Sequence, residues 1–249
     1  MTRAASILLV ALVLVAAGCT GDEPTPVETG AGEAKREVAI YLVRAGKVAP
    51  VRRVVDETPQ SSAGDALDAL LTGPTDAEQD AGYTTSVPLN ESAVVGVSGE
   101  TANVSISPER RLPALASAQL VHTLTQFAEV KRVVVDDSKP LTRKAFEDVA
   151  PQILIESPLD GDVVQSPIRL RGTANVFEAT VSIEVRDGTG TVVLEAFTTA
   201  TSGTGTRGTF DTELVLPAAT GTMTIVAFES SAKDGTPLHA TDVQVSVEP

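Results

Sequence analysis

The spacing of apolar residues changes near residue 152, and this change constrains the fold of the 249-residue chain more than any other feature. Upstream, apolar residues recur at helical spacing in two places, between short β-rich runs. Downstream, helical spacing does not recur, and β-rich runs alternate with turn signals. The pattern predicts an α+β domain at residues 38–137, a linker at 138–152 and an all-β domain at 153–249.

Both predicted helices lie in the first domain. One starts with a capping box at Ser62 and ends before Gly73-Pro74, because glycine and proline stop a helix. The other is expected over residues 112–129, and residues 75–92 are expected to form a long polar loop. Strands are expected at residues 38–43, 48–55, 93–97, 102–106 and 130–135. The predicted order is β-β-α-β-β-α-β, a sheet with helices on one face.

The second predicted domain is a β-sandwich. Val181, Ile183 and Val185 alternate with polar residues, which indicates a strand with one buried and one wet face. The chain has no tryptophan and one cysteine, which excludes the core of an antibody domain. Short β-rich runs with turns between them are typical of an immunoglobulin-like sandwich; they lie at 153–156, 168–173, 180–186, 192–197, 209–216, 222–228 and 241–247.

The first residues predict export. Arg3 is the only charged residue before Cys19, and an apolar run separates the two. A membrane-spanning helix needs about 20 residues, so this shorter run is typical of a secretory signal peptide at residues 1–18. Its end, Ala16-Ala17-Gly18-Cys19, resembles the bacterial lipobox, which implies a lipoprotein acylated on Cys19, with palmitate as a natural acyl group. The alternative is an ordinary signal peptide with an unrelated cysteine.

Composition restricts the surroundings of the mature protein. Residues 19–37 contain almost no large apolar side chain, so they are expected to form a flexible, lipid-anchored tether. The net charge of −14 excludes nucleic acid as a partner, because the phosphate backbone would be repelled. We therefore expect the protein at the extracytoplasmic face of the cell membrane, held there by its lipid. The low lysine content and the richness in alanine, valine and threonine are typical of a high-GC host such as an actinomycete.

The first domain resembles the GerMN domain of bacterial sporulation and germination lipoproteins over its whole length. The Leu-Leu-Thr-Gly-Pro block at residues 70–74 carries the most specific part of the likeness. The other matching runs are residues 51–54, 66–75, 82–88 and 119–127. The resemblance implies a role in envelope or spore-coat processes, and it supplies no catalytic residue.

The second domain resembles the immunoglobulin-like domain of bacterial spore-germination proteins, which commonly follows a GerMN domain. The Phe-Glu-Ser-Ser-Ala-Lys-Asp-Gly block at residues 228–235 is the most specific match. The resemblance implies binding or assembly, and its exposed candidates for a partner site are Glu178, Glu229, Lys233 and Asp234. The alternative for these residues is structural, since Lys233-Asp234-Gly235 makes a good turn between strands.

The sequence offers few candidates for a catalytic, cofactor-binding or metal-binding motif. Gly203 to Gly208 matches a dinucleotide fingerprint by letter, but a strand is predicted after it where that motif needs a helix. His122 and His239 lie in different domains, and a zinc site needs three or four converging ligands; we expect His122 on a helix face. Asp136-Asp137 would point to opposite faces of a strand, so we interpret them as a solubilising pair. We expect no catalytic, cofactor-binding or metal-binding residue.

The sequence therefore predicts a non-enzymatic, lipid-anchored envelope protein that displays two interaction domains to a protein or cell-wall partner, in envelope assembly or signalling. One alternative is a ligand-binding lipoprotein that senses or delivers cell-wall fragments, which requires an apolar pocket with a few convergent polar groups. A second alternative is a cell-wall hydrolase, which requires two carboxylates that face each other across a cleft.

Overall fold

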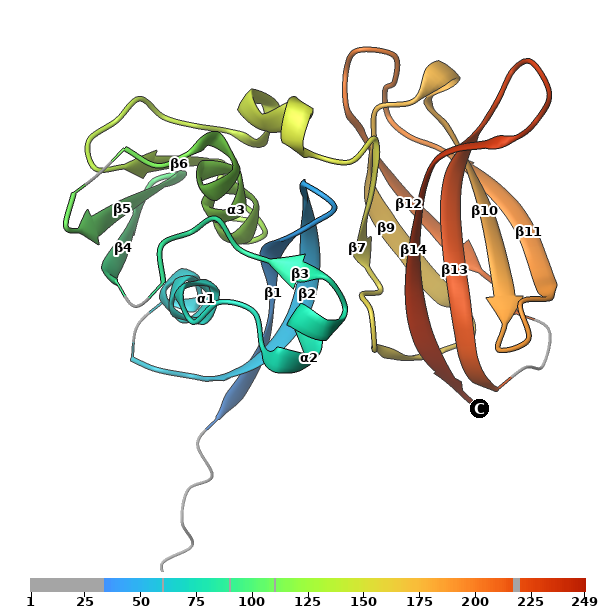
Figure 1. Ribbon diagram of the computed structural model, residues 1–249, viewed down its shortest axis with the longest axis horizontal. Helices are drawn as coiled ribbons and strands as arrows, with labels where there is room; N and C mark the ends of the chain where they lie inside the picture. Colours follow the sequence, from blue (N-terminus) through green and yellow to red (C-terminus); the bar gives the residue numbers. More distant parts are fainter. Residues whose placement is uncertain (1–33, 60, 90, 110, 217–219) are drawn as a thin grey trace, which may run out of the picture. The chain divides into compact units, whose positions relative to one another are not determined.

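A computed structural model describes residues 34–59, 61–89, 91–109, 111–216 and 220–249, shown in colour in Figure 1. The predicted signal peptide, the lipid-attachment residue Cys19 and all but the last residues of the predicted tether lie outside these ranges. The described residues belong to one compact unit, Glu33–Pro249. Within the described part of the chain, no helix is long and apolar enough to cross a membrane.

The first domain starts with a long antiparallel hairpin. Strands β1 (Lys35–Arg44) and β2 (Lys47–Asp56) pair over their full length, across a turn in which Ala45 and Gly46 have positive φ. Helix α1 (Ser62–Leu71) follows. Its N-cap is Ser61, one residue earlier than predicted, because the Gly64 amide donates to the Ser61 hydroxyl.

Part of the predicted loop at residues 75–92 is regular structure, so that prediction was wrong in this part. Helix α2 (Asp76–Asp80) starts at Thr75, which forms a reciprocal capping box with Glu78. Strand β3 (Tyr83–Thr84) follows and pairs with the end of β1. The capping signal at Thr75 was present in the sequence, but a helix of five residues is too short to show an apolar stripe.

The strands of the first domain form two sheets where one was predicted. Strands β4 (Ser92–Ser98) and β5 (Thr101–Ser107) make the expected hairpin, and β6 (Arg132–Val135) pairs in parallel with β5. This sheet, in the order β4-β5-β6, is separate from the sheet β2-β1-β3. Helices α1 and α3 (Ala114–Leu124) each contact strands of both sheets (Figure 1).

Side chains of α3, together with Gln126 just after its end, explain why the sheets stay separate. The Ala39 and Tyr41 amides of β1 donate to the side-chain oxygens of Gln126 and Thr123, at 2.9 and 3.0 Å. The side-chain amide of Gln119 donates to the Tyr41 carbonyl at 2.9 Å. Because these polar side chains satisfy the β1 backbone, that edge needs no further strand. The helix is also shorter than the predicted 112–129: it begins after Pro113 and ends at Leu124, where the chain turns to place Gln126 beside β1.

The segment predicted as a linker, residues 138–152, is part of the first domain's hydrophobic core. It contains the 3₁₀ segment η1 (Arg143–Val149), and Leu141 bridges to Val133 next to β6. The side chains of Phe146 and Ala150 are buried in the core that β1, α1 and α3 share. Pro140 and Pro151 lie near the two ends of this segment without separating it from the domain.

The second domain is a sandwich of two mostly antiparallel sheets, as predicted for an immunoglobulin-like fold. One sheet has the order β11-β10-β13-β14-β8 and the other β12-β9-β7 (Figure 1). Strand β8 was not predicted; it has three residues and pairs in parallel with the end of β14. The strands are β7 (Ile153–Ser157), β8 (Val163–Gln165), β9 (Ile168–Ala174), β10 (Thr180–Asp187), β11 (Val192–Thr199), β12 (Gly208–Leu214), β13 (Gly221–Ser230) and β14 (Pro237–Glu248).

Candidate functional site

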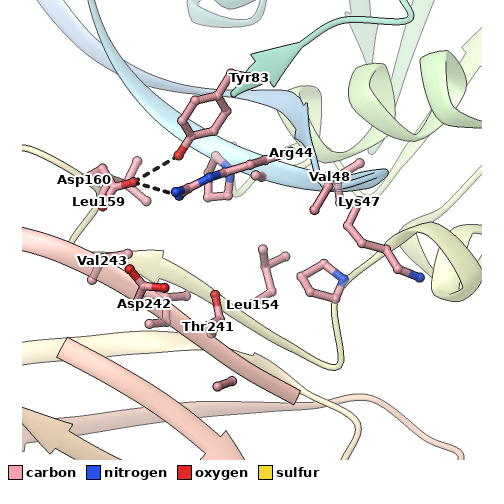
Figure 2. A pocket seen from close by; sticks show the side chains of 16 residues that line it. Arg44, Lys47, Val48, Tyr83, Leu154, Leu159, Asp160, Thr241, Asp242 and Val243 are labelled. Carbon is pink, nitrogen blue, oxygen red and sulfur yellow. Dashed lines mark hydrogen bonds and ion pairs between the residues drawn. The ribbon is translucent and has the colours of Figure 1, made fainter. Parts of the chain in front are cut away.

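A pocket of about 330 Å³ lies where the β1–β2 turn faces strands β7 and β14 of the second domain (Figure 2). We call it the hairpin pocket. Its apolar lining includes Val48, Pro50, Leu154, Leu159 and Val243, contributed by both domains. The volume is at the lower end of the range for small-molecule sites, and the lining combines apolar walls with a few polar groups, as such sites do.

The polar end of the hairpin pocket is organised around Asp160. The Tyr83 hydroxyl donates to Asp160 Oδ2 at 3.0 Å, and Arg44 Nη1 lies 3.5 Å from the same oxygen (Figure 2). The Gln244 amide donates to Oδ1 at 2.8 Å. Burial, reinforced by the negative charge of Asp160, raises the pKa of Tyr83 to about 12, so the phenol stays a proton donor. Asp242 also lines the pocket. Both carboxylate oxygens of Asp160 are already engaged, one by Tyr83 and Arg44 and the other by the Gln244 amide.

A second polar cluster joins the two domains through Tyr41, Arg143 and Glu156. The Tyr41 hydroxyl and Arg143 Nη1 both donate to Glu156 Oε1, at 2.5 Å each. Arg143 Nε donates to Thr125 Oγ1 at 2.7 Å, and the guanidinium lies 5.4 Å from the centre of the Tyr41 ring. Burial and the adjacent Glu156 raise the pKa of Tyr41 above its ordinary value. This cluster ties β1, η1 and β7 together.

Two further ion pairs cross between the domains. Arg52 on β2 makes a bidentate pair with Asp162, with both distances 2.7 Å. Arg207 Nε lies 3.0 and 3.1 Å from the two carboxylate oxygens of Glu147. Bidentate arginine–carboxylate pairs fix orientation as well as contributing energy. Arg207 belongs to the fingerprint-like segment 203–208, which leads into strand β12 and not into a helix, as the sequence predicted.

The sequence analysis did not predict the buried environment of His122. The side chain was expected on a helix face, but it is 1% exposed and its ring lies 5.1 Å from that of Tyr41. Neither ring nitrogen has a hydrogen-bond partner among the described residues. Burial, followed by the positive charges of Arg143 and Arg207, lowers the pKa of His122 to about 3. In helical spacing His122 lies off the apolar stripe of Leu120, Val121 and Leu124, so the local pattern contains no signal for its burial.

Three of the predicted partner residues, Glu178, Lys233 and Asp234, are exposed in short irregular segments of the second domain, whereas Glu229 lies partly buried in strand β13. Glu178 lies in η2 (Phe177–Ala179), with φ of +52°. Glu229 lies 3.9 Å from His239, and Asp234 accepts hydrogen bonds from the amide and hydroxyl of Thr236. The Lys233 amide donates to Ser231 Oγ in the same turn. A partner role for these four residues remains a prediction.

Asp136 and Asp137 follow strand β6, and both have positive φ. Asp136 Oδ1 accepts a hydrogen bond from the Ile106 amide at 2.9 Å, so this carboxylate terminates the β5–β6 pairing. Within the described ranges, no group of three or more histidine, cysteine, aspartate or glutamate side chains converges in a way that would hold a metal ion.

Comparisons with known proteins address the family of each domain. Residues 39–138 match the family model described as "Sporulation and spore germination". Residues 152–236 match the model described as "Immunoglobulin-like domain of bacterial spore germination". These models are germination-related domains and not known enzyme families. A comparison with curated proteins found no match.

Solved structures with some likeness include two from Bacillus subtilis and one from Methylosinus trichosporium OB3b. The tandem GerMN domains of the sporulation protein GerM are 14% identical, with 73% of this chain and 62% of that chain covered and a TM-score of 0.36. The first GerMN domain alone is 19% identical, with 44% and 98% covered and a TM-score of 0.32. CopC is 23% identical, with 39% and 94% covered and a TM-score of 0.26.

The two family models match residues 39–138 and 152–236, in this order, and they agree with the resemblance that the motifs at residues 70–74 and 228–235 carry. The protein is thus related to bacterial sporulation and germination proteins, and it carries a GerMN domain followed by an immunoglobulin-like domain of the spore-germination type.

Proposed function

We propose that this protein is a non-enzymatic component of the cell envelope, anchored through a lipid on Cys19, that displays its two domains to a protein or cell-wall partner. The observation that carries the proposal is the Ala16-Ala17-Gly18-Cys19 sequence directly after a short apolar run. In a chain related to sporulation and germination proteins, this arrangement supports a place at the extracytoplasmic face of the membrane.

The contacts between the domains favour two binding surfaces held in one fixed arrangement over two domains that move independently. Polar connections centred on Glu156, Asp160, Asp162 and Glu147 join the first domain to the second. Two binding surfaces held in one geometry require less ordering when a partner engages both of them. A role in envelope assembly or in signalling would use this property in the same way.

Metabolic labelling with an alkynyl fatty acid tests the anchor. We expect the wild-type chain to become labelled and to sediment with membranes, because each buried methylene of an acyl chain contributes about 0.8 kcal/mol to membrane binding. Cys19→Ala is expected to lose the label, whereas the neighbouring Thr20→Ala is expected to keep it. An unlabelled wild-type chain would overturn the proposed anchor.

Ligand binding in the hairpin pocket is the second candidate function. The observation that favours it is the combination of apolar walls with Tyr83, Arg44 and Asp160 at one end (Figure 2). Cell-wall fragments combine sugar hydroxyls, amides and small apolar side chains, which matches this lining in kind. The protein would then sense or deliver such fragments.

A thermal-shift titration with purified muropeptides tests this second function. A ligand at 100 times its Kd stabilises a folded protein by about 2.7 kcal/mol, which is readily measured as a rise in melting temperature. Ala240→Trp, which places an indole in the pocket lining, is expected to remove the rise. Ser246→Trp, exposed on the same strand but outside the pocket, is expected to retain it. No rise with the wild-type chain would count against this function.

A further inference from the structure

Polar contacts hold the two domains together, and both tyrosines of the chain take part in them. The Tyr41 hydroxyl donates to Glu156, and the Tyr83 hydroxyl donates to Asp160, so each phenol of the first domain is held by a carboxylate of the second. Domains of one chain move relative to each other unless the interface between them is large and apolar. A new charge at this interface would therefore act on the arrangement of the domains.

His122 lies on the side of α3 that faces this interface. Its ring is 5.1 Å from the ring of Tyr41, the residue that reaches Glu156 of the second domain. Arg143 Nη2 donates to the His122 carbonyl at 3.2 Å, and the same guanidinium is bound to Glu156. The groups that join the domains are thus the groups that surround the imidazole. Water reaches its two nitrogens only when these groups separate.

The charged groups around His122 offer no acceptor for an imidazolium. Arg143 of η1 and Arg207 of the second domain both act on the ring with positive charge. The acids beside them are already paired, Glu156 with Arg143 and Glu147 with Arg207. A proton on His122 would add a third positive charge to this group.

The other elements that contact α3 supply no free counter-ion in the described part of the chain. These elements are β1, β2, α1 and β6, and their charged side chains are exposed or engaged elsewhere. The pairs are Lys35–Asp56, Arg36–Asp65, Arg44–Asp160, Arg52 with Glu37 and Asp162, Arg53–Glu78 and Arg132–Glu100; Lys47 binds the Asp148 carbonyl, and Asp68 is exposed.

We propose that protonation of His122 separates the two domains, so that mild acid converts one fixed arrangement into two folded domains that move independently. In the closed form the imidazole has neither water nor an acceptor, so it stays neutral. In the open form water solvates the imidazolium, and Arg207 moves away with the second domain. The inference concerns only the arrangement of the domains, so it does not depend on the lipid anchor or on a ligand in the hairpin pocket.

The size of the effect follows from the proton affinity of the two forms. Burial lowers the pKa of His122 to about 3 in the closed form, whereas a solvated imidazole has a pKa of about 6.5. Below pH 6.5 the open form binds a proton that the closed form does not, so the ratio of open to closed molecules rises about tenfold per pH unit. Between pH 7 and 4.5 the rise is about a hundredfold. An open form populated at about 1% at neutral pH then equals the closed form.

The two tyrosines report the opening, because the chain has no tryptophan to mask their fluorescence. Residues 34–249 serve for the measurement, since all residues of both hydrophobic cores lie between Val38 and Val247. We expect quenching of tyrosine fluorescence by acrylamide to rise as the pH falls from 7, with a midpoint at about pH 4.5. Far-UV circular dichroism is expected to stay unchanged over this range, because both cores remain folded.

Substitution of each histidine assigns the transition. His122→Leu cannot take up the proton and is expected to lower the midpoint by at least one pH unit. His239→Leu is the matched control, because it changes the exposed histidine beside Glu229 and should keep the wild-type midpoint. Circular dichroism at pH 7 verifies that each variant is folded. An unchanged midpoint in a folded His122→Leu would overturn the proposal.

Small-angle X-ray scattering of the wild type gives a readout that needs no variant. The radius of gyration is expected to increase with the same midpoint as the quenching, because separated domains occupy more space. A constant radius down to pH 4 would refute the opening. Loss of the far-UV signal together with the change in quenching would also refute it, because acid would then unfold the domains and not separate them.

Discussion

Lowering the pH from 7 to 4 is expected to reduce the free energy of unfolding by about 3 kcal/mol through His122 alone. The folded state holds this imidazole neutral, with a pKa of about 3, whereas the unfolded chain protonates it near its ordinary pKa of 6.5. Below pH 6.5 the unfolded state therefore binds more protons than the folded state. The stabilisation is complete above that pH and is lost progressively as the pH falls towards 3. Urea unfolding at a series of pH values measures the loss.

Replacing the imidazole isolates its contribution from that of the carboxylates. His122→Leu is expected to unfold at pH 7 with at least the wild-type free energy, because it removes two buried nitrogens without partners in the described structure. The wild type should then fall below this variant as the pH decreases. His239→Leu, which changes the half-exposed histidine beside Glu229, should keep the full acid sensitivity. Identical pH profiles for the wild type and His122→Leu would contradict the assignment.

Phe146→Ala is expected to destabilise the protein by about 3–5 kcal/mol, the usual cost of truncating a buried phenylalanine. Phe146 is 7% exposed and packs in the core of the first domain, although it lies in the segment that the sequence predicts as a linker. Chemical denaturation monitored by circular dichroism gives the difference in free energy. A linker residue would give almost no change.

The control for this prediction is another phenylalanine in a different environment. Phe197→Ala removes the same atoms from a side chain that is 74% exposed, so its expected effect is within about 0.5 kcal/mol of zero. Equal effects of the two substitutions would show that Phe146 does not belong to the first core. The measurement thus decides how far the first domain extends beyond the family match that ends at residue 138.

The candidate sites were less predictable than the strands that carry them. The polar end of the hairpin pocket depends on Tyr83 and Asp160, which are 77 residues apart along the chain. Tyr41 and Glu156, which join the domains, are separated by 115 residues. No local pattern connects residues at such distances. A buried polar network becomes recognisable only when the partners that offset its desolvation are known.

Local periodicity alone determined where most strands and the two main helices form, because alternation and helical spacing are properties of neighbouring residues. It also predicted the β-sandwich, since alternation of apolar and polar residues, as at Val181, Ile183 and Val185, indicates strands with one buried face. Tertiary structure alone decided that side chains of α3 and Gln126 satisfy the β1 backbone and that the first domain has two sheets. It also decided that Phe146 joins the core and that His122 is buried as a neutral base. These outcomes depend on which distant groups meet, because burial and hydrogen bonding are determined by the assembled neighbours and not by the sequence around each residue.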